Sequence, residues 1–309
     1  MRFIIIDIRL NDVTGTHMNY EDKFESYMQT EKSAAKSTLS AYISDIREFT
    51  DFLAARGKQP EKANKADAAA FVLKLSEAGK SSATVNRKLA SLRGFYNYLQ
   101  QISVVKENPT AGIKSGKVVR KEPEFLTVEE VETLLDIKDE TAAGIRDRAM
   151  LELMYATGIR ASEVCAANIA DIDLRIGFIS VRSSGKTRMV PIGRPARAAL
   201  RTYMMSARKE LLKEKKDDGA LFLSYMGERL TRQGVWKILK FRAQQAGLDD
   251  KISPQILRNS FAAHMIQNGA DIKSLQDILG NEDIMAMRLY LTLTKNRIMD
   301  VYDKAFPRA

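Results

Sequence analysis

Hydrophobic residues recur with the period of an α-helix through most of the first hundred residues of the chain. Four such amphipathic segments are separated by short polar or glycine-containing stretches, at residues 20–29, 37–56, 65–78 and 81–99. Ser37, Asn64 and either Ser81 or Ser82 precede the apolar positions of the last three segments, and these residue types commonly cap helix N-termini. The pattern therefore predicts a compact bundle of four helices.

The helical period is interrupted between residues 104 and 124. Residues that end helices gather in this stretch together with cations, namely Lys106, Lys114, Lys117, Arg120 and Lys121. We interpret residues 105–124 as a basic linker, and a basic linker beside DNA gains affinity from every phosphate that it meets. The chain is thus predicted to have an N-terminal helical domain at residues 18–104 and a second domain at residues 125–309, preceded by an N-terminal extension at residues 1–17.

The second domain begins with clear helical signals. Thr127 and Glu130 have the spacing of a capping box, in which each side chain accepts a hydrogen bond from the backbone of the other. A long apolar helix is predicted at residues 146–157, and Gly158 ends it. Arg160 follows in the turn before the next short helix, so rigid backbone would hold it in place for a binding site. The alternative interpretation is a plain cation near the negative end of the helix dipole.

A β-hairpin is predicted further along the second domain. Residues 178–181 and 188–192 run or alternate apolar on either side of a polar turn, which places Lys186 near the hairpin tip. Further helices are predicted at residues 195–212 and after the capping residue Thr231, and Trp236 in the last of these is interpreted as a core residue. Together these patterns predict a mainly α-helical fold with a small β-hairpin or sheet in the C-terminal domain.

The composition favours one kind of partner and excludes several kinds of site. The 309-residue chain has 49 Lys and Arg against 39 Asp and Glu, and this net charge of +10 favours a polyanionic partner. The single cysteine, Cys165, excludes an internal disulfide and a Cys-rich zinc site, and it fits a reducing, cytoplasmic environment. With only two histidines, His17 and His264, a metal site is not expected, and no cofactor is predicted. No apolar stretch is long enough to span a membrane, so no membrane partner is expected.

The cations of the first domain have two interpretations. Lys36, Lys80, Arg87, Lys88 and Arg93 lie on or between the predicted helices. They either belong to solvated faces or contact the phosphates of a DNA groove across which the bundle lies. The sequence of this domain alone does not decide between the two.

Two arginines and a tyrosine of the second domain suggest a reaction at a DNA phosphate. Arg258 lies on the first of three short helices predicted within residues 253–290, and this stretch ends at Tyr290. In a transesterification at a phosphodiester, two guanidinium groups can neutralise the charge that develops on the non-bridging oxygens. A tyrosine can be the nucleophile when nearby cations favour its ionised form. We therefore expect Arg160, Arg258 and Tyr290 to converge on one phosphate in a reaction that needs no metal.

The segments around these residues occur in a distinctive order. They are RDRAMLELMYATGIRASEV, the hairpin end RMVP, PQILRNSFAAHM, LGNED and finally Tyr290. In this order, and in the interval from Arg258 to Tyr290, the chain resembles the tyrosine recombinases of the Xer and phage-integrase type. The resemblance extends from about Met18 to the C-terminus. It implies an N-terminal four-helix DNA-clamping domain followed by a tyrosine-recombinase catalytic domain.

The resemblance assigns roles to individual residues. Arg160 matches the first catalytic arginine of the family, Arg258 the second, and Tyr290 the nucleophile. Glu163 belongs to the Arg-x-Ser-Glu pattern of the family and would hold Arg160 in place without itself contacting the phosphate. Its alternative role is that of a surface carboxylate on a helix.

Other positions depart from the family pattern. The family usually has histidine three residues before the second arginine and histidine or tryptophan after the Leu-Gly of the next segment, where this chain has Gln255 and Asn281. Both amides can donate hydrogen bonds to a phosphate, but neither can carry a proton as histidine does. The family's general acid is typically the first lysine of a Gly-Lys-Gly-x-Lys-like hairpin tip. Counting forward from Arg160 places Ser184 there, whereas counting back from Pro191 aligns Lys186 with the later lysine. Lys186 would either protonate the leaving oxygen or only contact the DNA backbone.

The resemblance implies a site-specific DNA recombinase or integrase that cleaves and rejoins double-stranded DNA through a 3′-phosphotyrosyl intermediate, at full or attenuated rate. Assembly as a homotetramer on DNA, or together with a related recombinase, is also implied. The alternative is a catalytically impaired, recombinase-like DNA-binding protein that occupies or regulates recombination sites. General acid or base catalysis is typically worth about 10² to 10⁴ in rate, so the missing histidines are compatible with both functions.

Overall fold

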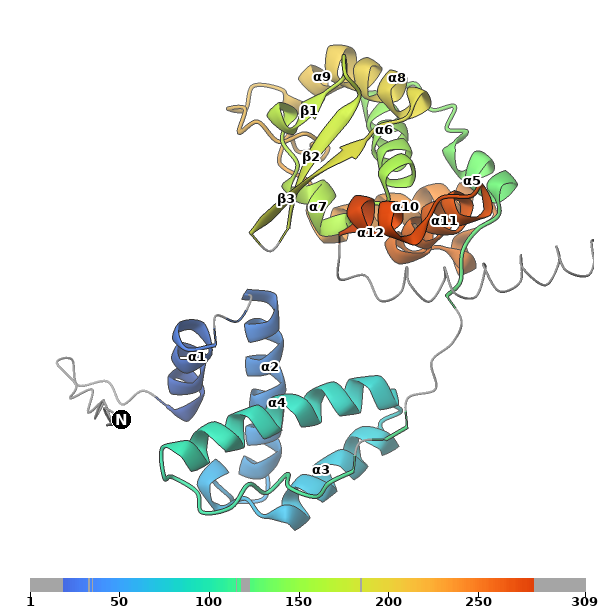
Figure 1. The fold of residues 1–309 in the computed structure, drawn as a ribbon. Helices are drawn as coiled ribbons and strands as arrows, with labels where there is room; N and C mark the ends of the chain where they lie inside the picture. Colours follow the sequence, from blue (N-terminus) through green and yellow to red (C-terminus); the bar gives the residue numbers. More distant parts are fainter. Residues whose placement is uncertain are drawn as a thin grey trace, which may run out of the picture. The chain divides into compact units, whose positions relative to one another are not determined.

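The computed structural model describes residues 19–32, 34, 36–114, 116–117, 123–183 and 185–280. The extension predicted at residues 1–17 lies outside this part of the chain. The chain divides into two compact units between residues 120 and 121. Helices make up most of the described residues of both units, and the described strands all lie in the second (Figure 1). The predicted fold class, mainly α-helical with a small sheet in the C-terminal half, is confirmed. Among the described helices, none is both long and apolar enough to cross a bilayer.

The described part of the first unit contains the four α-helices that the sequence predicts. They are α1 (Tyr20–Thr30), α2 (Lys36–Ala54), α3 (Lys65–Glu77) and α4 (Ser82–Gln101), with a short 3₁₀ turn, η1 (Pro60–Lys62), before α3. The side chain of Asn64 accepts a hydrogen bond from the backbone N–H of Asp67 at 3.1 Å, and the Asp67 carboxylate accepts one from the backbone of Asn64 at 3.0 Å. Ser81 caps α4 by accepting from the backbone N–H of Thr84 at 3.2 Å. Local capping residues therefore set where α3 and α4 begin.

Aromatic rings from all four helices form the core of the first unit. Phe24, Phe49, Phe71 and Phe95 are fully buried, and each comes from a different helix. The ring centroids of Phe24 and Phe95 are 5.6 Å apart and those of Phe49 and Phe71 are 5.0 Å apart, both in an edge-to-face arrangement. These contacts hold the bundle together as one unit.

The stretch after α4 continues to pack on the first unit. Val105 and Ile113 contact its core. On α4, Arg93 donates a hydrogen bond to the carbonyl oxygen of Ile113, and Asn86 donates to that of Gly116 at 2.8 Å. Part of the segment predicted as a linker therefore lies against α4.

The cations on α4 hold the bundle together. Lys88 is buried, and its ammonium donates to the carboxylates of Asp45 at 2.8 Å and Glu48 at 2.6 Å, both on α2. Arg87 also forms an ion pair with Asp45. For Lys88 both interpretations drawn from the sequence are wrong, because a buried ammonium with two carboxylate partners is neither solvated nor available to a DNA phosphate. The side chain of Lys36 lies outside the described part of the molecule.

The second unit contains the remaining described helices. Its α-helices are α5 (Val128–Leu135), α6 (Ala142–Thr157), α7 (Ala161–Ala166), α8 (Arg194–Thr202), α9 (Arg208–Leu212), α10 (Arg232–Gln245), α11 (Pro254–Gln267) and α12 (Ile272–Leu279), with short 3₁₀ turns η2 (Ile169–Asp171) and η4 (Asp249–Lys251). The helix predicted at residues 195–212 is interrupted by a π-helical turn, η3 (Tyr203–Ala207). Tyr203 in this turn is buried, and its hydroxyl accepts a hydrogen bond from the backbone N–H of Leu223 at 3.2 Å. This contact between distant residues accompanies the departure from a regular α-helix.

The described strands form one antiparallel sheet. Its order is β1 (Ile172–Asp173), β2 (Phe178–Ser183) and β3 (Lys186–Pro191). The register pairs Phe178 with Pro191 and Ser183 with Lys186, so the predicted hairpin is present and Lys186 begins β3. Both strands reach closer to the hairpin tip than predicted, because their backbone pairing continues past the apolar positions.

Helix α6 lies at the centre of the second unit. It packs against α5, α7, α8, α9 and α11. Met150, Leu151, Leu153 and Met154 are all buried, so apolar residues face several directions around the helix. Because α6 is held on many sides, Gly158 at its C-terminal end has a fixed position in the unit.

Candidate functional site

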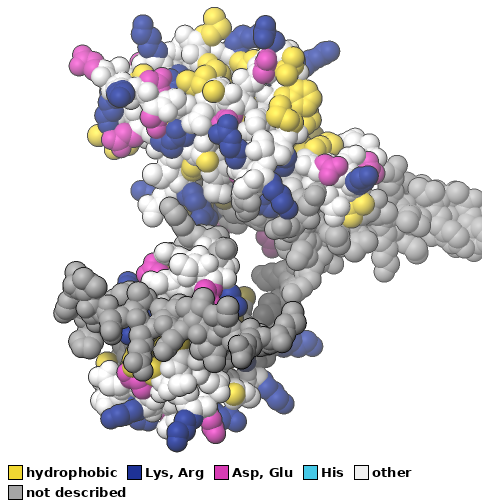
Figure 2. All heavy atoms as spheres, turned by 60° about the vertical axis from the view of Figure 1, so that its left-hand side comes forward, with side chains coloured by type: hydrophobic (Ala, Val, Ile, Leu, Met, Phe, Trp, Pro, Cys, Tyr) yellow, Lys and Arg dark blue, Asp and Glu magenta, His cyan; other side chains and the backbone are white. Residues whose placement is uncertain are grey.

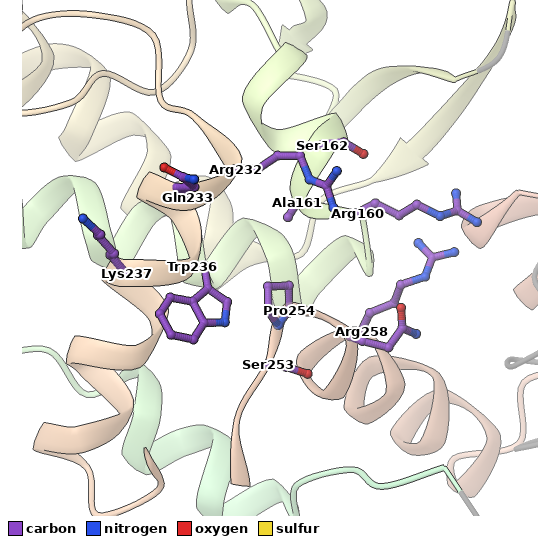
Figure 3. Close-up of a pocket in the computed structure, with 11 residues that line it drawn as sticks. Arg160, Ala161, Ser162, Arg232, Gln233, Trp236, Lys237, Ser253, Pro254 and Arg258 are labelled. Carbon is purple, nitrogen blue, oxygen red and sulfur yellow. The ribbon is translucent and has the colours of Figure 1, made fainter. Parts of the chain in front are cut away.

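An open pocket of about 900 Å³ lies in the second unit where α7, α10 and α11 begin (Figure 3). Its lining includes four cationic side chains, Arg160, Arg232, Lys237 and Arg258. Among the described residues, no Asp or Glu lines it. A concave surface of this charge suits an anionic ligand.

Arg160 occupies the N-cap position of α7, and Glu163 in the first turn holds it. The backbone N–H of Arg160 donates to Glu163 Oε2 at 2.7 Å, and Arg160 Nη1 lies 3.4 Å from Oε1. Burial raises the pKa of Glu163, but hydrogen bonds from Arg188 and from the Arg160 backbone outweigh this effect, so the pKa is lowered overall. Glu163 is therefore a buried, ionised support for Arg160 and not a surface carboxylate.

Arg258 reaches the same pocket from α11, although only 3% of it is exposed. Its Nη1 donates to the carbonyl oxygen of Gly158, and its Nη2 donates to that of Leu279 at 2.8 Å. Gly158 has φ of +58°, and a Cβ built on it would lie only 2.5 Å from Phe261 and 2.7 Å from Leu279. Only glycine fits at this helix end without displacing its neighbours. Figure 3 shows the guanidinium groups of Arg160 and Arg258 extending toward the same space.

The last described residue, Gly280, lies beside Arg160 and directly follows Leu279, whose carbonyl oxygen accepts from Arg258. A Cβ built on Gly280 would lie 3.9 Å from Nη1 of Arg160. The structure thus brings together the two predicted arginines and the start of the segment that leads to the predicted nucleophile. Asn281 and Tyr290 themselves lie outside the described residues.

Gln255 lines the pocket with the two arginines. Its Nε2 donates to Oδ1 of Asn259 at 2.9 Å, and the Asn259 amide donates to the carbonyl oxygen of Glu124 at 3.0 Å. Ser253 caps α11 by accepting from the backbone N–H of Ile256 at 3.1 Å. Gln255 therefore stands in the first turn of α11, where the helix dipole favours a bound anion.

Lys186 does not line the pocket. It is exposed at the start of β3, opposite Ser183 in the register of the hairpin. Ser184, the other position considered for a general acid, lies outside the described residues.

The prediction of Trp236 as a core residue is wrong. Trp236 is 49% exposed and lines the pocket, and the ammonium of Lys240 lies 6.0 Å from its ring centroid. Arg232 and Lys237 on the same helix line the pocket too. Val235 is fully buried, and successive residues of a helix point about 100° apart, so the neighbouring tryptophan faces outward. Helix α10 therefore presents an aromatic and basic surface to the pocket.

Charged and ligand-forming side chains also lie outside the pocket. On the face shown in Figure 2, Lys and Arg side chains are visible on both units with Asp and Glu among them. Where the structure describes the chain, no cluster of three His, Cys, Asp or Glu residues could hold a metal ion. Cys165 is a free, half-buried thiol that packs against the core, and burial raises its pKa.

Two family profiles match the chain. The profile of the Phage integrase family matches residues 124–297. The profile of the Phage integrase, N-terminal SAM-like domain matches residues 22–101, which contain most of α1 and all of α2, α3 and α4. Each profile falls within one of the two compact units.

Curated relatives match over nearly the whole chain. The tyrosine recombinase XerD of Oceanobacillus iheyensis is 38% identical over 291 residues, which cover 93% of this chain and 98% of that protein. The tyrosine recombinase XerC of Halalkalibacterium halodurans is 40% identical over 295 residues, which cover 93% of this chain and 96% of that protein.

Solved structures share the fold. The XerH site-specific recombinase bound to a palindromic difH substrate matches with a TM-score of 0.71 and 22% identity, over 91% of this chain and 83% of that one. A lambda integrase tetramer bound to a Holliday junction matches with a TM-score of 0.66 and 20% identity, over 87% of this chain and 76% of that one. By its family profiles and its curated relatives, the chain belongs to the phage integrase family of tyrosine recombinases.

Proposed function

We propose that the protein is a site-specific DNA recombinase that cleaves and rejoins strands through a 3′-phosphotyrosyl intermediate on Tyr290. The observation that carries this proposal is that Arg160 and Arg258, far apart in the sequence, line one cationic pocket together with Gln255. Two guanidinium groups on one phosphate can bind its non-bridging oxygens and stabilise the charge that develops there. The tyrosine recombinases among the curated relatives support the same reaction.

The proposed reaction consists of two transesterifications. The Tyr290 phenol gives up its proton as its oxygen attacks the scissile phosphorus. The bond from phosphorus to the 5′ oxygen breaks, and that oxygen takes up a proton. The 5′ hydroxyl of a partner strand then attacks the phosphotyrosine, which restores a phosphodiester and releases Tyr290. Each step replaces one phosphate ester by another, so the reaction needs no external energy source. Arg160 and Arg258 would stabilise the transition state of both steps.

Proton transfer is the step of this reaction for which the chain lacks the family's usual histidines, at positions 255 and 281. Gln255 and Asn281 can donate hydrogen bonds to the phosphate, but an amide does not exchange protons at neutral pH as histidine does. Lys186 at the exposed end of the hairpin is the proposed general acid for the leaving oxygen. We therefore propose that the enzyme cleaves slowly.

We also propose that both units bind the duplex and that four copies act together. The first unit supports this because it matches the SAM-like domain of integrases. XerH is solved on its DNA substrate, and lambda integrase is solved as a tetramer on a Holliday junction. Exchange between two duplexes requires four strand cleavages, one for each copy. The other copies would be the same chain or a related recombinase, on DNA in the cytoplasm.

Covalent trapping tests the proposal. Incubated with nicked suicide duplexes taken from the DNA that flanks the gene, the wild-type protein should form a protein–DNA adduct that survives a denaturing gel. Tyr290→Phe should form none, because it lacks the attacking oxygen. Tyr225→Phe changes a tyrosine that is 71% exposed elsewhere in the second unit, and it should trap as much as wild type. An equal adduct with Tyr290→Phe would refute the assignment of the nucleophile.

A non-cleaving DNA-binding protein is the second candidate, and the amide at Gln255 favours it. This candidate predicts site-specific binding that weakens with salt and no adduct from the wild-type chain. The triple variant Gln255→His, Asn281→His, Ser184→Lys separates the two. Cleavage recovered from a silent parent supports the second candidate, whereas an adduct formed by the unaltered chain excludes it.

A further inference from the structure

Arg188 joins three elements of the second unit. It lies on β3, and its Nη1 and Nη2 donate to the two carboxylate oxygens of Glu163 on α7 at 2.8 Å and 2.9 Å. Its Nε donates to the carbonyl oxygen of Ile278, in the last turn of α12, at 2.7 Å. Only 14% of its side chain is exposed. One guanidinium group therefore connects a strand, the helix that begins at Arg160 and the helix that ends before Gly280.

Arg188 and Arg160 share the carboxylate of Glu163 unequally. Arg188 binds both oxygens at hydrogen-bond distance, whereas Arg160 Nη1 lies 3.4 Å from one of them. Arg160 lines the pocket and Arg188 does not. Arg188, the closer and bidentate partner, therefore compensates most of the negative charge of Glu163. As a result, Glu163 neutralises less of the positive charge of Arg160, which faces the pocket.

Arg188 also contacts the backbone at the end of α12. The Ile278 carbonyl that it binds comes two residues before Gly280, and a Cβ built on Gly280 would lie 3.8 Å from Arg188 Nη1. The chain continues from Gly280 toward Tyr290. An arginine with a rigid, forked donor pattern is well suited to fix this part of the chain, because each of its three guanidinium nitrogens donates a hydrogen bond here.

We infer that Arg188 is a positioning residue for the proposed cleavage reaction. It binds the carboxylate of Glu163, so that the guanidinium group of Arg160 stays oriented and charged toward the scissile phosphate. It also anchors the end of α12, from which the chain leads to Tyr290. This inference rests on the proposed function. Arg188 contacts no reacting atom and acts through Glu163 and the backbone of Ile278.

Single-turnover cleavage by the full-length protein tests the inference. At saturating nicked DNA, Arg188→Gln should cleave about 10²-fold more slowly than wild type, since a displacement of about 1 Å in a catalytic group can have an effect of that size. The Kd for DNA should stay within about threefold, because the buried side chain offers little charge to the duplex. Arg188→Lys keeps the charge but loses the fork, and its rate should fall about tenfold.

Arg182→Gln is the matched control. Arg182 lies on the neighbouring strand β2 and pairs with Asp171 at 2.7 Å, while 66% of its side chain is exposed. Its removal also breaks an ion pair of the hairpin, but one that does not involve the pocket residues, so its cleavage rate should remain within about twofold of wild type. A rate for Arg188→Gln equal to that of this control would overturn the inference.

A double-mutant cycle separates positioning from simple stabilisation. Glu163→Gln alone should slow cleavage, because it leaves two guanidinium groups facing each other. The double variant Glu163→Gln, Arg188→Gln should cleave at least about tenfold faster than Arg188→Gln alone, because Arg160 is then no longer neutralised by a buried carboxylate. Melting temperatures are measured in parallel. Losses that simply multiply, or that follow the melting temperature, would show a merely structural role and overturn the inference.

Amide hydrogen exchange tests the inference without cleavage. In Arg188→Gln, the peptides that cover α12 should exchange faster than in wild type, and in Arg182→Gln they should not. If the wild-type protein forms no adduct, the proposed function fails, and this measurement still decides whether Arg188 anchors α12. Equal exchange in all three proteins would overturn the anchoring.

Discussion

Each unit buries a carboxylate among cations, but the partners of the two carboxylates come from different places. In the first unit, Asp45 on α2 accepts hydrogen bonds from Lys88 at 2.8 Å and from Ser91 at 2.9 Å, and it pairs with Arg87. All three partners lie on one helix, α4. The cluster therefore joins two helices of the bundle.

In the second unit, Glu163 has partners from separate elements. Arg160 lies at the start of its own helix and lines the pocket, and Arg188 lies on β3 and also reaches α12. The same chemical arrangement thus stabilises the first unit and, in our proposal, prepares a reactive site in the second. A buried ion pair therefore bears on function when one of its members also lines a cationic pocket that suits an anionic ligand.

Removing the carboxylate of Asp45 should have the largest effect on stability and none on chemistry. Asp45→Asn leaves the buried ammonium of Lys88 with poorer compensation, which should destabilise the first unit by about 3 to 5 kcal/mol. In urea unfolding, circular dichroism should show an earlier transition. The fluorescence of Trp236, the one tryptophan of the chain, reports on the second unit and should keep its midpoint.

The matched control for Asp45 is Glu48→Gln. Glu48 also pairs with Lys88, but 45% of its side chain is exposed, so the loss should stay below about 1 kcal/mol. Equal losses for Asp45→Asn and Glu48→Gln would contradict the assignment of Asp45 as the central partner. At temperatures where Asp45→Asn is folded, its cleavage rate with saturating DNA should match wild type.

Gly158→Ala should destabilise the second unit and also slow cleavage. The new methyl group meets Phe261 and Leu279 at well under contact distance, and the residue has positive φ. Strain and overpacking together should cost about 2 to 4 kcal/mol. Gly219→Ala is the control, because Gly219 has a similar φ of +78° but nothing within 4 Å of its Cβ position.

The comparison of these two glycine variants isolates the role of Gly158. Gly219→Ala should lose only about 1 to 2 kcal/mol in urea unfolding, and its cleavage rate should not change. Gly158→Ala should also cleave more slowly, because the Gly158 carbonyl that accepts from Arg258 is displaced. An unchanged cleavage rate in Gly158→Ala would show that this carbonyl does not set the position of Arg258.

A third carboxylate, Asp139, extends the comparison to the pH dependence of stability, and its removal should change the stability least. Hydrogen bonds from the Thr141 hydroxyl at 2.6 Å and from Arg242 at 2.7 Å lower the pKa of Asp139 to about 2 from 3.8. Because the folded pKa lies below the unfolded one, the stabilisation is fully present above about pH 4 and disappears as the pH falls toward 2. Asp139→Asn should therefore melt below wild type at pH 6. The two melting temperatures should converge at low pH, and a constant difference would contradict this assignment.

Much of the fold could be predicted because its signals are local. Thr127 and Glu130 form the predicted capping box, with hydrogen bonds of 2.9 Å and 3.2 Å, and the strands of the hairpin pair as their apolar pattern indicated. Caps and turns depend on residues a few positions apart, so the sequence contains the whole interaction. The π-helical turn at Tyr203 could not be predicted, since its contact with Leu223 joins separate segments.

The site was only partly predictable. Its two arginines were identified by a resemblance, and the structure places both in one pocket. Arg188 was missed because an arginine in an exposed-looking hairpin gives no signal that it pairs with Glu163. Trp236 was assigned to the core because hydrophobicity was weighed without knowing which face of α10 is covered.

Most of the helices, the hairpin, the excess of positive charge and the candidate catalytic residues could be identified from the amino-acid sequence. Only folding determines which charged side chains are buried in ion pairs, such as Lys88, and which line a pocket, such as Arg160. The physical reason is the range of the interactions. Capping and periodicity act within a turn or two of the chain, whereas the burial and pairing of a charge depend on distant segments that only folding brings together.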